Sequence, residues 1–264
     1  MTEVRRHLIT GEPILYAPGR AERPRWDSAV CPFCPGHEGE TPPEIARAGD
    51  PWRVRVFPNK FPFVEYHEVI VETREHDATF GTIEHAADVV AIYVERYRAL
   101  RPFGTVALFK NHGSMAGASL PHEHSQIAAL PFVPPRIARE AEAFRRAAEC
   151  PLCKVQSAES ENGSFRMIDP GARMFSGERW IVPKRHMSEM SSANAADLAE
   201  MLQRAARRTP GAYNWLFFNY PDVPRAHFYI SVAPRVSPVA GFELETGTFI
   251  DGLRGREVSG LRTR

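Results

Sequence analysis

The segment Pro121-His-Glu-His-Ser-Gln-Ile127 decides the fold, because the chain carries a second version of it, Pro224-Arg-Ala-His-Phe-Tyr-Ile230. Before each segment the same features follow one another: a Cys-x-x-Cys pair, a strand that leads to a histidine, and a helical stretch. They occupy residues 31–34, 69–76 and 84–100 in the first half and residues 150–153, 180–186 and 195–208 in the second. A plan that occurs twice in one order predicts a duplicated α+β unit.

Residue periodicity supports this plan. The helical stretches carry apolar residues at helical spacing, and the predicted strands are rich in β-branched and aromatic residues. We expect strands at 53–57, 67–72, 105–109, 179–182, 214–218 and 227–232. The Pro-rich segments 13–24 and 42–51 are expected to be loops or arms. The predicted organisation is a first repeat over residues 1–130, a linking helix over 131–149 and a second repeat over 150–264.

The composition is that of a globular protein that binds small ligands. Of 264 residues, 43% are apolar and 25% are charged, and the formal net charge is +1. No overall positive field therefore attracts nucleic acid or an anionic membrane. The apolar stretches are too short to span a bilayer, and the N-terminus MTEVRRHLIT has no apolar signal core. We expect a cytoplasmic protein without nucleic-acid or membrane partners, whose paired cysteines serve metal or redox chemistry.

Four residues of the first half form a candidate metal site. Cys31 and Cys34 offer two thiolates from one tight turn, and His76 and His122 can each end a strand. Two sulfur and two nitrogen ligands suit a closed tetrahedral zinc site. A lone Cys-x-x-Cys pair or a lone histidine would be weak evidence, but their combination predicts bound zinc.

The residues His122, His124 and Gln126 form a candidate reaction site. Alternate side chains of an extended strand share a face, so these three point the same way. One imidazole can bind the metal while the next attacks phosphorus. The amide of Gln126 can donate a hydrogen bond to a phosphoryl group without adding charge.

The H-x-H-x-Q pattern and the Cys-x-x-Cys pair resemble the galactose-1-phosphate uridylyltransferases, the transferase branch of the histidine-triad superfamily. The resemblance covers nearly the whole chain, and four further segments carry it: Gly19–Pro24, Arg55–Pro62, Phe109–Gly113 and Ala240–Glu243. It implies a duplicated histidine-triad-like fold, in which two antiparallel-sheet and helix repeats form one half-barrel-like sheet. It also implies zinc on Cys31, Cys34, His76 and His122.

The resemblance assigns roles to individual residues. His124 becomes the nucleophile and Gln126 a phosphate contact. The resemblance also implies a homodimer, in which residues of one chain complete the pocket of the other. The expected substrate contacts are Arg20 and Arg23 with phosphates, Asn59 near the nucleoside, Asn111 and Ser119 at the α-phosphate, and Glu243 with sugar hydroxyls.

The implied reaction is double displacement on a nucleotide sugar. Neutral His124 attacks the α-phosphorus, and a sugar 1-phosphate captures the covalent nucleotidyl-histidine. A first alternative is a phosphorylase of the ADP-glucose phosphorylase kind, in which inorganic phosphate is the acceptor. A second alternative is a catalytically idle nucleotide-binding protein. Gln126 argues against a hydrolase, because hydrolytic relatives carry a third histidine at this position.

The second half departs from the family. A further metal of many relatives uses one glutamate and three histidines, but here Glu140 and His227 remain and Phe218 replaces a histidine. A different second site, formed by Cys150, Cys153, His186 and His227, stays open beside the alternative that both thiols only pack as small apolar groups. Glu123, in the middle of the motif, is expected to point to the opposite strand face and to meet a cation or solvent.

Overall fold

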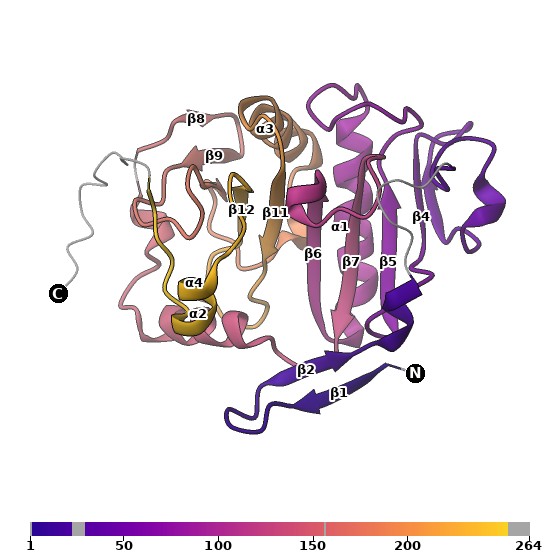
Figure 1. Cartoon of the computed structure of the whole chain (residues 1–264). Helices are drawn as coiled ribbons and strands as arrows, with labels where there is room; N and C mark the ends of the chain where they lie inside the picture. Colours follow the sequence, from indigo (N-terminus) through magenta and orange to yellow (C-terminus); the bar gives the residue numbers. More distant parts are fainter. Residues whose placement is uncertain (1, 23–29, 156, 253–264) are drawn as a thin grey trace.

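The computed structural model describes residues 2–22, 30–155 and 157–252, and within them one antiparallel sheet of ten strands dominates (Figure 1). The order is β3-β4-β5-β7-β6-β11-β12-β10-β9-β8. The bounds are β3 Ala46–Ala48, β4 Val54–Pro58, β5 Tyr66–Val71, β6 Thr105–His112, β7 His124–Leu130, β8 Ser160–Glu161, β9 Phe165–Ile168, β10 Arg179–Pro183, β11 Tyr213–Phe218 and β12 Tyr229–Pro234. The α+β class with a large antiparallel sheet is therefore confirmed.

The order of the strands is symmetric about the centre of the sheet. β4, β5, β7 and β6 of the first half correspond in order to β9, β10, β12 and β11 of the second, and β6 and β11 meet in the centre. Their register pairs Asn111 with Asn214 and Phe109 with Leu216. This arrangement supports the division into repeats at 1–130 and 150–264, which we keep as a proposal together with the half-barrel description.

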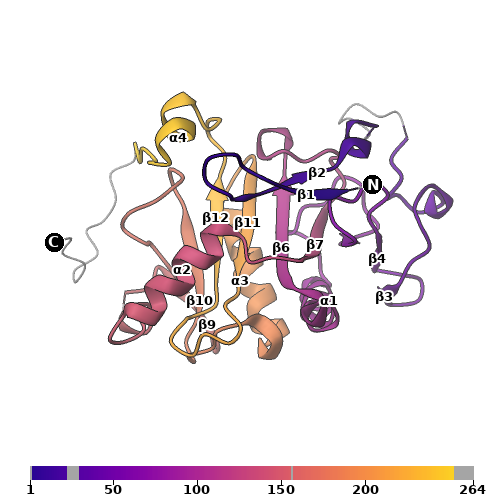
Figure 2. The ribbon, with the colours of Figure 1, turned by 90° about the horizontal axis from the view of Figure 1, so that it is seen from below.

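Two helices cover one face of the sheet. These are α1 (Ala86–Leu100) and α3 (Ala195–Arg208), which lie side by side below the strands in Figure 2. Their buried residues recur at helical spacing and form one core with the strands, so burial of this apolar stripe stabilises both helices. The side chain of Asn194 caps α3 by accepting from the Asp197 N–H at 3.1 Å. Both helices were expected at these places.

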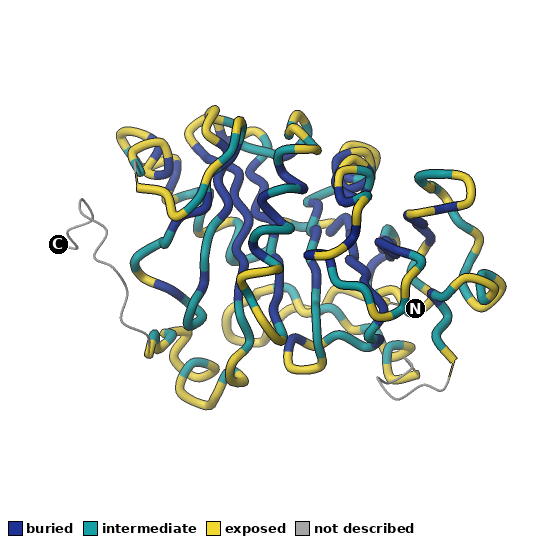
Figure 3. Tube along the Cα trace, turned by 90° about the horizontal axis from the view of Figure 1, so that it is seen from above, coloured by how far each residue is buried: buried dark blue, intermediate teal, exposed yellow. Residues whose placement is uncertain are grey.

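The opposite face is covered differently in the two halves. In the second half, α2 (Pro135–Arg146) packs Ala141 and Phe144 against the sheet. It is shorter than the predicted linking helix, because Pro134 has an extended ψ of 145° and Pro135 opens the first turn. In the first half this face carries a pocket instead. Figure 3 shows the central strands buried and the loops at their ends exposed.

The Pro-rich N-terminal region is more regular than expected. A separate hairpin joins β1 (Glu3–Arg6) to β2 (Pro13–Tyr16), and β3 lies within the segment 42–51. Backbone pairing stabilises these short strands despite their composition, within the hairpin for β1 and β2 and at the edge of the large sheet for β3. The C-terminal helix α4 (Gly241–Thr246) lies on the same side of the sheet as the hairpin (Figure 2). In the described part of the chain, no helix has the length and apolar character to cross a membrane.

Candidate active site

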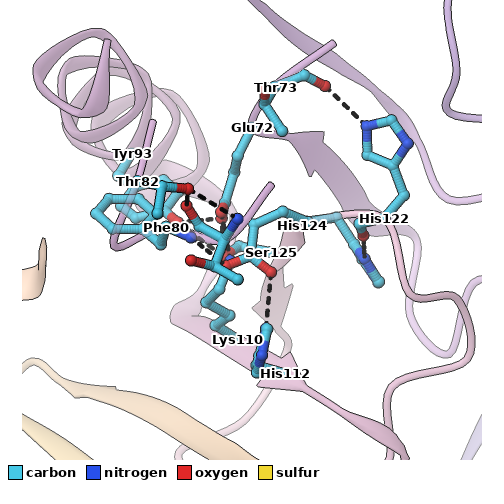
Figure 4. A network of polar contacts seen from close by, with 12 residues as sticks. Glu72, Thr73, Phe80, Thr82, Tyr93, Lys110, His112, His122, His124 and Ser125 are labelled. Atoms are coloured by element: carbon cyan, nitrogen blue, oxygen red, sulfur yellow. Dashed lines mark hydrogen bonds and ion pairs between the residues drawn. The ribbon is translucent and has the colours of Figure 1, made fainter. Parts of the chain in front are cut away.

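His124 opens β7 and has the geometry of a nucleophile. Its side chain is 5% exposed, and its Nδ1 lies 2.7 Å from the carbonyl oxygen of His122 (Figure 4). Because a carbonyl only accepts, Nδ1 carries the proton and Nε2 keeps the lone pair. Burial lowers the pKa of His124 to about 4, which leaves the imidazole neutral at pH 7. The backbone therefore holds the tautomer in which Nε2 of His124 has a free lone pair.

Gln126 follows two residues later on the same face, and its amide orientation is held by two neighbours. Its Oε1 accepts from Nδ2 of Asn59 at 3.2 Å, and Nε2 of His67 lies 3.0 Å from the same oxygen. Oδ1 of Asn59 accepts from the Phe61 N–H at 2.8 Å, so Nδ2 of Asn59 is the donor toward Gln126. With its oxygen engaged, Gln126 presents its NH₂ group as the donor.

A cavity of about 320 Å³ contains His124 and Gln126. Two predicted substrate contacts, Asn59 and Ser119, line it as well. Its walls are largely apolar, a suitable surface for the flat face of a base. The other lining residues are Val30, Pro32, Phe33, Glu40, Thr41, Pro42, Phe57, Lys60, Phe61, Val69 and Leu120.

The remaining predicted contacts lie at different distances from this cavity. Asn111 stands two residues after Phe109, which pairs with Gln126, so it shares the face of the reaction site. Arg20 donates to the carbonyl oxygen of Phe61 at 2.9 Å and so lies beside the cavity. Glu243 lies on α4 and lines a separate cleft with Phe249, so one chain does not bring it to His124. Arg23 lies outside the described residues.

A buried charged network lies behind β7. Glu123 points away from the cavity, as expected, and meets Lys110 Nζ at 3.2 Å and His112 Nδ1 at 2.9 Å. Lys110 also pairs with Glu72, to which Ser125 donates at 2.5 Å (Figure 4). Burial by itself raises the pKa of Glu123, but the charge of Lys110 and the hydrogen bonds from His112 and the Phe80 N–H together outweigh it and lower the pKa to about 2. Paired charges inside the core stabilise one strand register at His124.

The four predicted metal ligands of the first half come together. Sγ of Cys31 lies 3.5 Å from Nδ1 of His122, and Sγ of Cys34 lies 3.3 Å from Nδ1 of His76. Tetrahedral zinc with ordinary bond lengths separates sulfur and nitrogen ligands by about 3.5 Å. Nε2 of His122 donates to the carbonyl oxygen of Thr73 at 2.8 Å, which turns Nδ1 toward the sulfurs. The donor set fits a metal ion.

A second cluster of the same kind lies in the second half, where Cys150, Cys153, His186 and His227 gather within 4.8 Å. Nδ1 of His227 is 3.5 Å from both sulfurs, and its Nε2 donates to the Pro183 carbonyl at 2.9 Å. His227 therefore corresponds to the metal-ligand position of His122 rather than to His124. Two Cys₂His₂ clusters that could bind metal are thus present among the described residues.

Among the residues that the structure describes, Glu140 belongs to no cluster of candidate metal ligands. Glu140 accepts from the hydroxyls of Tyr220 and Tyr229 and from Nε of Arg136. The ring of Phe218 stacks on Tyr229 with centroids 4.6 Å apart. The carboxylate is saturated by these donors, so this region is a packed part of the second half.

Sequence reasoning missed His67 and Asn214. Asn214 donates to Oδ1 of Asn111 at 2.8 Å, and His67 holds Gln126. The alternation of His67 with Val69 and Val71 along β5 was a usable signal, because it places the ring on the face of Gln126. No local pattern marks Asn214, since its partner is 103 residues away.

The chain is similar in sequence to known proteins along much of its length. Residues 20–133 match the family described as the domain of unknown function (DUF4931) N-terminal domain. ADP-glucose phosphorylase of Arabidopsis thaliana is 28% identical, over 97% of this chain and 91% of its own length. Galactose-1-phosphate uridylyltransferase of Thermotoga maritima is also 28% identical, over 95% of this chain and 94% of its own.

A solved structure shares the architecture. The crystal structure of the Arabidopsis thaliana ADP-glucose phosphorylase with bound ADP-glucose superposes with a TM-score of 0.78 and 28% identity, over 96% of each chain. Along nearly its whole length the chain is therefore galactose-1-phosphate uridylyltransferase-like, and it is similar to ADP-glucose phosphorylase to the same degree.

Proposed function

We propose that this enzyme transfers a nucleoside monophosphate from a nucleotide sugar to a phosphate acceptor through a covalent nucleotidyl group on His124. The observation that carries the proposal is the lone pair on Nε2 of His124, held in a cavity beside the amide donor of Gln126. Nε2 bonds to the α-phosphorus while the bond from phosphorus to the bridging oxygen breaks and the sugar 1-phosphate leaves. An oxygen of the acceptor phosphate then displaces Nε2 and restores the histidine.

In this proposal the other residues orient the substrate and exclude water from the intermediate. Gln126, Asn111 and Ser119 donate hydrogen bonds to the α-phosphoryl oxygens, and Asn59 sits beside the nucleoside. The ring of Phe33 packs against His124 with centroids 5.2 Å apart. An apolar wall at this place limits the access of water, which would otherwise hydrolyse the intermediate.

We propose zinc as the ion of both Cys₂His₂ clusters. Four ligands close each site, so the ion would supply folding stability rather than a reactive position. In the first half the ion would tie the turn of Cys31 and Cys34 to His122, whose carbonyl orients His124. The metal is therefore structural in this proposal.

The acceptor distinguishes two activities. A sugar 1-phosphate as acceptor makes the enzyme a uridylyltransferase-like transferase, our main proposal. Inorganic phosphate makes it a phosphorylase, which the likeness to ADP-glucose phosphorylase along 97% of the chain favours as the second candidate.

One experiment tests the function and separates the two activities. The enzyme is incubated with UDP-glucose or ADP-glucose, and intact mass is measured for a nucleotidyl adduct. The isolated adduct is then chased with sugar 1-phosphates or with inorganic phosphate, and the nucleotide products are identified. A new nucleotide sugar supports transfer, and a nucleoside diphosphate supports phosphorolysis. Absence of an adduct with every nucleotide sugar would instead favour an idle nucleotide-binding protein.

Gln126→Ala is expected to slow the first chemical step without abolishing it. Loss of one preorganised donor at the phosphoryl group costs on the order of 2–4 kcal/mol, or about 30- to 1,000-fold in rate. Single-turnover kinetics of adduct formation provide the measurement. Gln203→Ala is the matched control, because Gln203 lies on α3 and bonds the carbonyl of Ile83. An unchanged rate in Gln126→Ala would remove this residue from the mechanism.

We further propose a homodimer in which Glu243 of a second copy approaches the cavity of the first. Within one chain Glu243 lies in a separate cleft, while Leu8 and Ile9 at the tip of the β1–β2 hairpin are 99% and 87% exposed. Light scattering over a dilution series is expected to give twice the chain mass. A monomer with full activity would contradict the proposal.

A further inference from the structure

Asn214 brings the second half of the chain to the reaction site. It lies on β11 directly across from Asn111 of β6, at the centre of the sheet where the two halves meet. Its side chain is buried. A buried amide has to satisfy both its oxygen and its NH₂ group, so its partners determine its orientation.

Three partners surround this amide. Nδ2 of Asn214 donates to Oδ1 of Asn111 at 2.8 Å and to the carbonyl oxygen of Ala116 at 2.9 Å. Its Oδ1 accepts from Nη1 of Arg235 at 3.2 Å. A carbonyl only accepts and a guanidinium only donates, so a reversed amide would face like groups on two sides. Arg235 and Ala116 therefore determine how Asn214 is turned.

The orientation of Asn214 determines that of Asn111. Because Asn214 donates to Oδ1 of Asn111, the NH₂ group of Asn111 remains for a different acceptor. Asn111 shares the sheet face of Gln126, whose oxygen is likewise held by neighbouring donors. Both amides are thus arranged to present N–H groups rather than oxygen, as an anionic phosphoryl group requires.

The second bond of Asn214 reaches the loop that precedes β7. Ala116 ends the short 3₁₀ helix Ser114–Ala116, three residues before Ser119, which lines the cavity. One buried side chain therefore holds both Asn111 and the loop of Ser119. Among the hydrogen bonds that the structure describes, no residue of the first half donates to the side-chain oxygen of Asn111 in place of Asn214.

We propose that Asn214, oriented by Arg235, is a positioning residue that turns the Asn111 amide toward the α-phosphoryl group. This rests on the proposed function, which assigns Asn111 and Ser119 to that group. The second half thereby takes part in catalysis although its own H-x-H motif is incomplete. Asn214 touches no substrate and acts through Asn111 and the loop.

Asn214→Asp is the sharpest variant, because it keeps the shape of the side chain and removes its donors. A carboxylate facing the Asn111 oxygen favours rotation of that amide, which presents oxygen to the phosphoryl group. We expect kcat to fall about 100-fold, as for loss of an oxyanion donor, with KM changed less than about threefold. Asn214→Ala is expected to lower kcat about tenfold, since Asn111 then loses orientation but keeps its donor.

Two comparisons separate positioning from loss of stability. Asn219→Ala removes another buried amide of the same half, which accepts from the Met190 N–H, and is expected to lower the melting temperature with kcat unchanged. In Asn111→Ala, the added change Asn214→Ala is expected to have almost no further effect on kcat. Additive losses in the double variant would overturn the proposal, as would a kcat unchanged in Asn214→Asp.

A second pair of variants, at Arg235, tests the proposal even if the Asn214 variants fold poorly. Arg235→Lys keeps a donor near Oδ1 of Asn214, whereas Arg235→Met does not. We expect near-normal kcat in the lysine variant and a fall of about tenfold in the methionine variant. Equal kcat in the two would overturn the role of Arg235.

The orientation of the Asn111 amide can also be followed by NMR, without an activity assay. Its side-chain ¹⁵N–¹H signals, assigned with Asn111→Ala, are expected to shift in Asn214→Asp and to stay in place in Asn219→Ala. If wild-type enzyme forms no adduct, the proposed function fails while this shift still supports the positioning of Asn111. Unmoved signals overturn the positioning even where transfer is observed.

Discussion

His124→Ala is expected to form no nucleotidyl adduct and to show no turnover, while its fold and metal content stay normal. In the proposed mechanism the removed Nε2 is the group that bonds to phosphorus, and the hydrogen bond lost with the ring joins Nδ1 to the carbonyl oxygen of His122, two residues earlier in the chain. For comparison, loss of the nucleophile in a covalent mechanism costs on the order of 10⁶ in kcat. Intact mass after incubation with a nucleotide sugar and steady-state kinetics provide the measurements.

Two further variants sharpen this result. His124→Gly leaves a cavity in place of the ring, and added imidazole is expected to restore transfer to itself, giving a nucleotidyl-imidazole. Tyr229→Phe is the matched control, because Tyr229 stands two residues after His227 as His124 stands two after His122. It is expected to form the adduct at a near-normal rate. An active His124→Ala together with an inactive Tyr229→Phe or His227→Ala would place the active site in the other half.

Cys31→Ser is expected to lower stability strongly and to reduce zinc from two ions per chain to one. Structural zinc binds with on the order of 10 kcal/mol, comparable with the 5–15 kcal/mol of a typical unfolding free energy. Even a loss of about 3–5 kcal/mol lowers the melting temperature by about 10 °C in a chain of this size. Elemental analysis and thermal unfolding followed by circular dichroism provide the measurements.

Cys150→Ser tests the second cluster in the same way. It is expected to remove the other zinc and to lower the melting temperature, with kcat nearly unchanged, because no ligand of that cluster adjoins His124. The first cluster includes His122, so Cys31→Ser is expected to affect kcat more than Cys150→Ser does, though less than it affects stability. Freshly purified wild-type protein without zinc would refute the metal assignment at both clusters.

Much of the fold could be predicted from short-range sequence patterns. The helices around Tyr93 and Leu202 follow from apolar residues at helical spacing, and most strands of the sheet begin and end within a few residues of their predicted bounds. These features are local, because the spacing of apolar residues within a short window indicates whether it forms a helix or a strand. The β1–β2 hairpin was missed, since its pairing joins segments without a regular apolar alternation.

The sequence by itself determined which groups could do the chemistry. The order and spacing of Cys31, Cys34, His76 and His122 predicted the first metal cluster, and alternation placed His124 and Gln126 on one face. Ligand type and strand alternation depend on residue identity and position alone, so they can be read without coordinates.

Only the tertiary structure decided how those groups are oriented. The tautomer of His124 depends on a carbonyl direction, and the amides of Gln126 and Asn111 are turned by His67 and Asn214 from other strands. Tertiary packing likewise placed His227 with Cys150 and Cys153 and kept Glu243 away from the cavity of its own chain. Hydrogen-bond direction is set by partners that long loops separate in sequence, and such partners meet only after the two halves join at β6 and β11.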